Sequence, residues 1–115
     1  MNVTRTVPLT SAHVNLGATP STSGANQLVA AASGAKYRVL SVAIVATTAV
    51  SVKFQSASTD ITGTFPLGAN GGFVLPFNEH GWFETNENQA LNINLSGAVS
   101  TGVQIQYIKI PVASN

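Results

Sequence analysis

Apolar and polar residues alternate along much of the chain. Between residues 49 and 55, three apolar side chains fall on one face of an extended segment and the polar side chains fall on the other. The same alternation returns at residues 91–95 and 103–107. A period of two is typical of a β-strand with one buried and one solvent-facing side. No stretch of ten residues keeps the i, i+3, i+4 spacing of an amphipathic helix, so the pattern predicts an all-β chain.

The segment from Lys36 to Ala46 has a different pattern. Its charges lie only at the start, in Lys36 and Arg38, and apolar residues then occupy both faces. Strands that are buried on both sides show such near-continuous apolar runs. We therefore predict a central strand that is covered on both sides.

The spacing of these segments predicts the architecture. About seven to nine short strands, spaced by roughly 8–12 residues, indicate a single β-sandwich of jelly-roll or immunoglobulin-like type. Residues 1–25 differ, because Thr, Ser, Ala, Gly and Pro dominate there without a sustained period. We interpret residues 1–25 as an extended N-terminal arm that adds an edge strand or reaches a neighbour, and residues 26–115 as the sandwich domain. Deletion of residues 1–20 is expected to leave the sandwich folded.

The composition narrows the classes of function. The 115 residues are enough for one domain with one core. Charged residues make up 8% of the chain, against about 25% in a typical soluble domain, and the net charge is +1. This balance gives no electrostatic basis for binding nucleic acid or an anionic membrane. Since solitary soluble domains usually carry a net charge of about 2–8, the composition favours a protein that works inside an assembly.

Cysteine content and hydropathy exclude further classes. The chain contains no cysteine, which excludes disulfides and zinc–thiolate sites. The longest apolar stretch, residues 39–52, is shorter than the ~20 residues that span a bilayer, and Ser and Thr interrupt it. The N-terminal residues lack the apolar core of a secretory signal. We expect a protein that is made in a cytoplasm, stays soluble there or becomes part of a particle assembled there, and has no membrane partner.

Few side chains are suited to catalysis. The chain has four acids and two histidines. Glu79 and His80 are adjacent in a predicted turn, where both side chains would face solvent. A metal site built from His13, His80 and Glu84 would need three distant segments to converge, with no short ligand spacing to support it. The sequence therefore predicts no catalytic, metal or cofactor site, and no enzyme.

Five aromatic residues fall between Phe65 and Phe83. The favoured interpretation is a core that gathers its large rings, with Trp82 closing one end of the sandwich. The alternative is a sugar-stacking or partner-binding platform made by Trp82 and Phe83. Both interpretations stay open from the sequence.

Five strings of the central segment stand out together, at residues 50–56, 60–63, 66–77, 81–85 and 90–96. As a set they resemble small virion proteins of tailed bacteriophages, and among these the capsid decoration (cement) proteins. This resemblance implies a compact β-sandwich, often a homotrimer, bound to the phage major capsid protein on the outer surface of the head. It also implies a location in the virion and a role in stabilising the head, with an N-terminal arm that helps to anchor the protein. No catalytic motif accompanies the resemblance.

Two groups of apolar residues are candidates for contacts between subunits or with the capsid. The first lies in the predicted arm, and the second lies opposite the buried face of the last strand. A tail or baseplate module and a glycan-binding module are the alternative functions. The candidate interface residues are Val7, Leu9, Val14, Leu16, Ile108 and Ile110.

Overall fold

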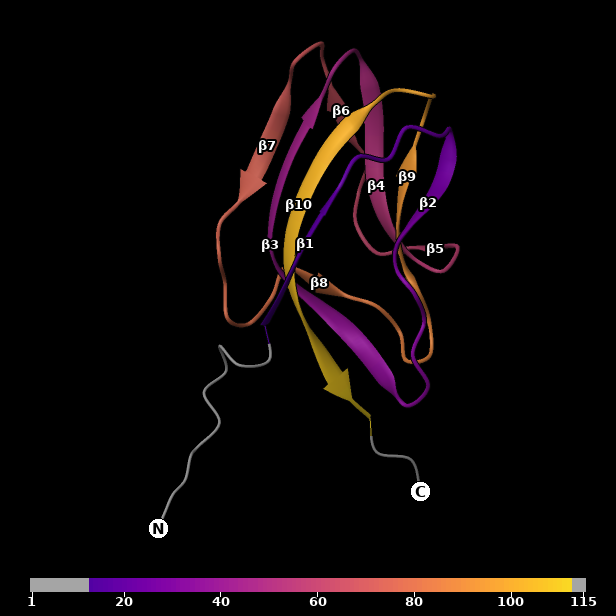
Figure 1. Ribbon diagram of the computed structural model, residues 1–115, viewed down its shortest axis with the longest axis vertical. Coiled ribbons are helices and arrows are strands. Elements are labelled where there is room, and N and C mark those ends of the chain that lie inside the picture. Colours follow the sequence, from indigo (N-terminus) through magenta and orange to yellow (C-terminus); the bar gives the residue numbers. More distant parts are fainter. Residues whose placement is uncertain (1–12, 113–115) are drawn as a thin grey trace.

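The computed structural model, which describes residues 13–112, is a sandwich of two antiparallel five-stranded sheets (Figure 1). Sheet A has the order β1-β10-β3-β7, with β8 also paired to β3, and sheet B has the order β2-β9-β4-β5, with β6 also paired to β4. The strands of sheet A are β1 (His13–Ala18), β3 (Ala35–Ala46), β7 (Gly72–Leu75), β8 (Phe83–Glu84) and β10 (Thr101–Pro111). Those of sheet B are β2 (Gly24–Val29), β4 (Val50–Ser56), β5 (Thr59–Asp60), β6 (Phe65–Leu67) and β9 (Leu91–Leu95).

The connectivity is that of a jelly roll. Strands β1 and β2 lie in different sheets, as do β3 and β4, and the first strand pairs with the last. An immunoglobulin sandwich instead keeps its first two strands in one sheet. The predicted all-β sandwich is confirmed.

The core lies between the two sheets, and the alternation in the sequence identifies it correctly. The side chains of this core are buried almost completely, as in Val52, Phe54, Leu91, Ile93 and Ile105. Their polar neighbours in β4 and β9 face outward. Each strand thus places one side chain in two into the core, as the period of two predicts.

Strand β3 only partly meets the prediction of cover on both sides. A bulge between the registers of Val39 and Ser41 leaves Leu40 without a partner in β10, and both Val39 and Leu40 are buried. The segment after β7 covers this place: Asn78 N–H donates to the Leu40 carbonyl at 3.0 Å. At the other end of β3 the prediction is wrong, because Val45 is 55% exposed on the outer face of sheet A.

The N-terminal segment contributes two strands to the sandwich. Strand β1 is an edge strand of sheet A, and β2, which contains the expected boundary at residue 25, is an edge strand of sheet B. The arm's predicted edge strand therefore exists from His13 onward. Val7 and Leu9 lie outside the described residues.

The aromatic residues divide between core and surface. Phe83 packs on Phe54 with ring centroids 4.8 Å apart, and Phe65 packs on Phe73 at 4.6 Å, as a shared core requires. Trp82 does not close an end of the core, however. It is 42% exposed, with its indole N–H donating to the Pro76 carbonyl at 2.8 Å.

Candidate functional surfaces

The outer face of sheet A carries small and uncharged side chains over its upper half, which is the part around the C-terminal end of β3. Antiparallel pairing places directly opposite residues on the same face. Gly17, Gln104, Ala43 and Val74 form one such row across β1, β10, β3 and β7. Val45 lies beside this row, and with Val74 at 67% exposure it makes an exposed apolar surface.

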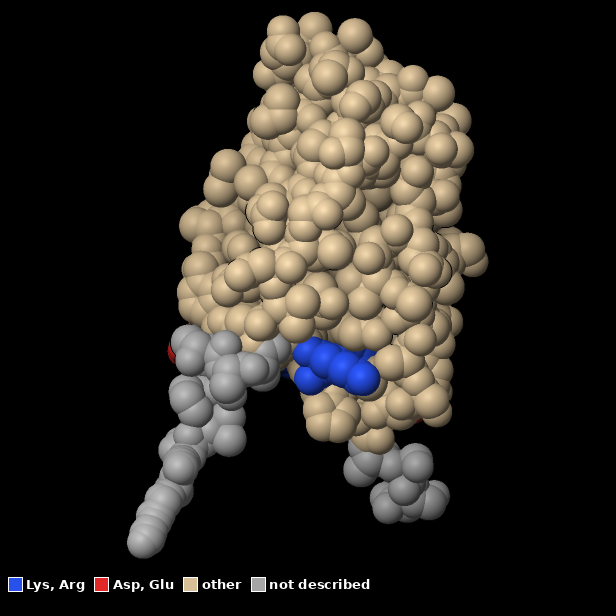
Figure 2. Space-filling view, in the orientation of Figure 1, with Lys and Arg blue, Asp and Glu red and all other residues tan. Residues whose placement is uncertain are grey.

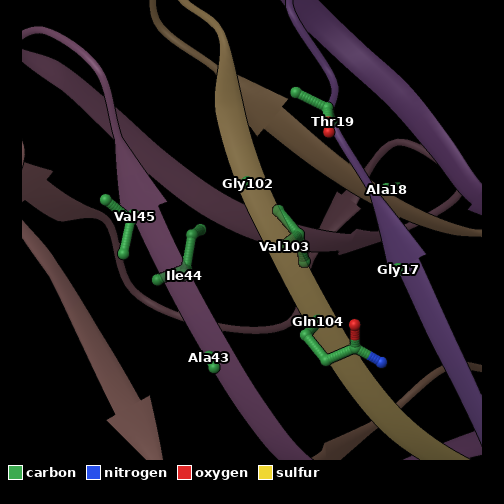
Figure 3. Close-up of a pocket in the computed structure, with 9 residues that line it drawn as sticks. All are labelled: Gly17, Ala18, Thr19, Ala43, Ile44, Val45, Gly102, Val103 and Gln104. Atoms are coloured by element: carbon green, nitrogen blue, oxygen red, sulfur yellow. The ribbon is translucent and has the colours of Figure 1, made fainter.

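A shallow depression of about 450 Å³ lies on this face (Figure 3). Its floor is low because Gly17 and Gly102 have no side chain. The side chain of Gln104 extends toward β1, and a Cβ atom at Gly17 would lie 2.9 Å from its Oε1. The full lining is Gly17, Ala18, Thr19, Ala43, Ile44, Val45, Gly102, Val103 and Gln104.

The outer face of sheet B is different in chemistry. Lys53 Nζ lies 3.1 Å from Asp60 Oδ2, and Gln55 Nε2 donates to Asp60 Oδ1 at 2.8 Å. These two hydrogen bonds hold the pKa of Asp60 below its ordinary value, and the bond from Gln55 has the larger effect. Asn94 Nδ2 reaches Gln55 Oε1 at 3.4 Å. Most polar groups of this face bond to one another, although Asn92 Oδ1 has no hydrogen-bond partner among the described residues, and the face suits exposure to water.

Charge is sparse over the molecule as a whole. Figure 2 shows a face on which one group of Lys or Arg atoms, near its lower end, interrupts a surface that is otherwise uncharged except at its margins. On the outer face of sheet A, charge gathers at the lower end of β3. There the Glu84 carboxylate accepts hydrogen bonds from Lys36 Nζ at 2.6 Å and Arg38 Nε at 3.0 Å. These contacts lower the pKa of Glu84, and the hydrogen bond from Lys36 has the largest effect.

The segment between β7 and β8 adds exposed aromatic rings to this lower end. Phe77 is 53% exposed, and its ring centroid lies 5.5 Å from that of His13 at the start of β1. Trp82 lies in the same segment, whereas Phe83 turns into the core. The structure does not bring Trp82 and Phe83 together as one stacking platform.

The candidate interface residues lie on both sides of sheet A. Ile108 and Ile110 are half-buried and share the outer face with Arg38 and Lys36, their partners in β3. Val14, which is 41% exposed, and Leu16 face the inner side at the edge of the sheet.

The sequence reasoning missed Val45, Val74 and the glycine floor. The apolar run in β3 does point to this surface, because the sequence does not show which segment would cover its second face. Which residues cover such a run depends on the placement of distant segments and is not readable from the run itself.

The described residues offer contact surfaces and little acid–base chemistry. Within residues 13–112 no group of three or more His, Asp or Glu side chains is placed to hold a metal ion. Glu79 and His80 approach to 3.9 Å, but both side chains are largely in solvent. No helix in this part of the chain is long and apolar enough to cross a membrane.

Comparisons with known proteins add little to this picture. No description of a protein family matches the chain, and no curated protein matches it. Among solved structures, a chain of the Bacillus endospore appendages, described as a novel family of disulfide-linked pili, is 15% identical with a TM-score of 0.47. The alignment covers 88% of this chain and 86% of the other. At this identity and TM-score the similarity carries no functional information.

Proposed function

We propose that the chain is a non-enzymatic structural subunit that associates with copies of itself and with a larger particle. The supporting observation is the upper outer face of sheet A, where Gly, Ala, Val and Gln stand at solvent-facing positions. Antiparallel sheets usually place polar side chains on such a face. Covering this surface requires no ion to be stripped of water, so the cost of desolvation is low.

Within that class, we propose that the chain decorates a phage head as a homotrimer bound to the major capsid protein. The resemblance of the central segment to virion proteins supports this role. A low net charge favours close approach of many identical copies, and symmetric repetition makes each weak contact count several times.

The test is to count copies of the chain in purified particles of the phage that encodes it. Quantitative mass spectrometry should find nearly as many copies as capsid subunits, and cryo-electron microscopy should place them on the head. A handful of copies, located on the tail, would instead support the tail or baseplate alternative. Absence from the particle refutes a virion role.

A pair of variants tests whether sheet A provides the contact. Val45→Glu combined with Val74→Glu adds charge to the exposed apolar surface and should lower occupancy of the particle by at least about tenfold. Gln27→Glu, at an exposed position of β2 in sheet B, is the control and should leave occupancy unchanged. If both variants occupy the particle as fully as the wild type does, the contact lies on another surface.

Glycan binding is a second candidate, favoured by the exposed ring of Trp82. An exposed indole can stack on a sugar ring. Binding on a glycan array that is lost in Trp82→Ala and kept in Trp82→Phe would support it. No binding by the wild-type chain would retire it.

A further inference from the structure

The sheet edges in the described part of the chain differ in their protection against pairing with another chain. Natural sheets protect an edge with charge, proline, a bulge or extreme shortness. Strands β5 and β8 have two residues each and carry Asp60 and Glu84, while β6 contains Pro66. Strand β7 has four residues and is followed by Pro76, and β2 is interrupted by a bulge.

Strand β1 has none of these protections. Its six residues include no acid, lysine, arginine or proline. They pair with β10 in one uninterrupted register. Within residues 13–112 no strand pairs with the other edge of β1. Among the described residues, this regular and uncharged edge is therefore left without a paired strand.

The hydrogen-bonding pattern identifies the groups that face the open edge. Thr101 N–H donates to the Pro20 carbonyl at 3.0 Å, so these opposed residues form a hydrogen-bonded pair. Such pairs alternate along an antiparallel ladder. The even-numbered residues of β1 therefore bond to β10. The odd-numbered residues His13, Asn15 and Gly17 turn their N–H and C=O groups to the open edge.

We propose that β1 pairs antiparallel with β1 of a second copy, so that sheet A continues across both molecules. The inference rests on the self-association in the proposed function, and it concerns a two-fold contact that is separate from the three-fold contact of the proposed homotrimer. Each copy presents the same unprotected edge, and a two-fold contact of that edge with itself needs no second complementary surface. An axis at Asn15 places His13 opposite Gly17 of the second copy, which matches the outward groups. It also places Val14 against Leu16 of the second copy and covers the exposed side of Val14.

The N-terminal segment of a neighbouring copy fits this edge less well. To place Val7 and Leu9 on the apolar side, an antiparallel strand would set Pro8 opposite an outward-facing residue of β1. Proline has no N–H to donate there, so the ladder would lose a bond at its centre. The identical β1 edge has no such gap.

The test compares Asn15→Pro with Asn15→Thr. Proline removes the outward N–H of residue 15 while the bonds of Leu16 and Val14 to β10 remain, whereas threonine keeps the donor and suits a strand. Sedimentation velocity over a range of concentrations should show dimers for the wild type and Asn15→Thr. The dissociation constant of Asn15→Pro should rise by at least about tenfold, because backbone bonds across the axis are lost.

Hydrogen exchange on the wild type provides a measurement that needs no variant. The amides of Asn15 and Gly17 should be protected at high concentration and exchange faster on dilution. The Leu16 amide, bonded within the sheet, should stay protected throughout and serves as the internal control. Concentration-independent exchange at Asn15 and Gly17 overturns the proposal.

Other outcomes also overturn it. These are a wild-type monomer at high concentration, a trimer that Asn15→Pro leaves intact, and a dimer that deletion of residues 1–12 abolishes, which assigns the edge to the N-terminal segment. Particle occupancy is scored separately. Absence of the wild-type chain from particles refutes the decoration role and leaves the solution dimer standing. A folded wild type that stays monomeric in solution refutes β1 pairing, whereas the copy count on particles still decides the decoration role.

Discussion

At the scale of single residues, Glu84 is the most strongly connected charge among the described residues. Its single carboxylate contacts both Lys36 and Arg38, which lie two residues apart on the outer face of β3. The three side chains are about one-third exposed, at 29%, 34% and 36% in the order Lys36, Arg38, Glu84. Solvent screening at such exposure limits the contribution to about 0.5–1 kcal/mol.

This contribution should depend on pH. Because the contacts lower the pKa of Glu84 in the folded state, the stabilisation is present above the pKa of the unfolded chain and is lost as the pH falls through the folded-state pKa. Glu84→Gln should be about 0.5–1 kcal/mol less stable than wild type at pH 7, with the gap closing in acid. Urea denaturation across this range measures it. Glu87→Gln, at an exposed residue, is the control; an equal, pH-independent loss in both variants would contradict the role of the ion pairs.

At the scale of elements, two glycines on the outer face of sheet A have opposite roles. A Cβ atom on Gly72 would overlap the backbone oxygen of Ile44, whereas one on Gly102 would find its nearest neighbour, the Val45 oxygen, at 3.9 Å. Close approach of β7 to β3 therefore requires glycine at position 72. At position 102 the space is open, and glycine only lowers the floor of the depression.

Gly72→Ala and Gly102→Ala form a matched pair. Gly72→Ala should destabilise the chain by about 1–3 kcal/mol, because two backbones must move apart. Gly102→Ala should stay within about 0.5 kcal/mol of wild type. Thermal denaturation followed by circular dichroism separates the two. Similar melting temperatures for both variants would show that β7 shifts without cost.

The elements also show what the sequence could predict. The strict alternation in β4 and β9 identified their buried faces, because a sheet exposes every second side chain. The run in β3 did not reveal its bulge at Leu40 or the exposure of Val45. The bulge arises in the pairing of β3 with β10, and the segment after β7 contacts β3 at Leu40 but leaves Val45 exposed. The pattern of apolar and polar residues shows the period of a strand. Whether each face of the strand is buried depends on contacts between distant parts of the chain.

At the scale of the whole molecule, the sandwich class followed from strand number and spacing, but the sheet order did not. Jelly-roll connectivity requires β1 to pair with β10, across almost the full length of the chain. Nothing local in residues 13–18, which include no Thr or Ser, specifies that pairing. The expected boundary at residue 25 reflected this, since composition changes there while the sheets already include β1.

Two truncations determine where the folded unit begins. Deletion of residues 1–12 leaves every described strand pair in place and should not change the melting temperature. Deletion of residues 1–20 removes β1, which exposes one side of Val103 and Ile105 and discards the packing of Leu16. The loss should be at least about 2 kcal/mol, or a melting temperature lower by roughly 10 °C. This revises the expectation that residues 1–20 are dispensable. Equal stability of the two truncated chains would restore that expectation, because β1 would then be attached to the sandwich without contributing to its cooperative unfolding.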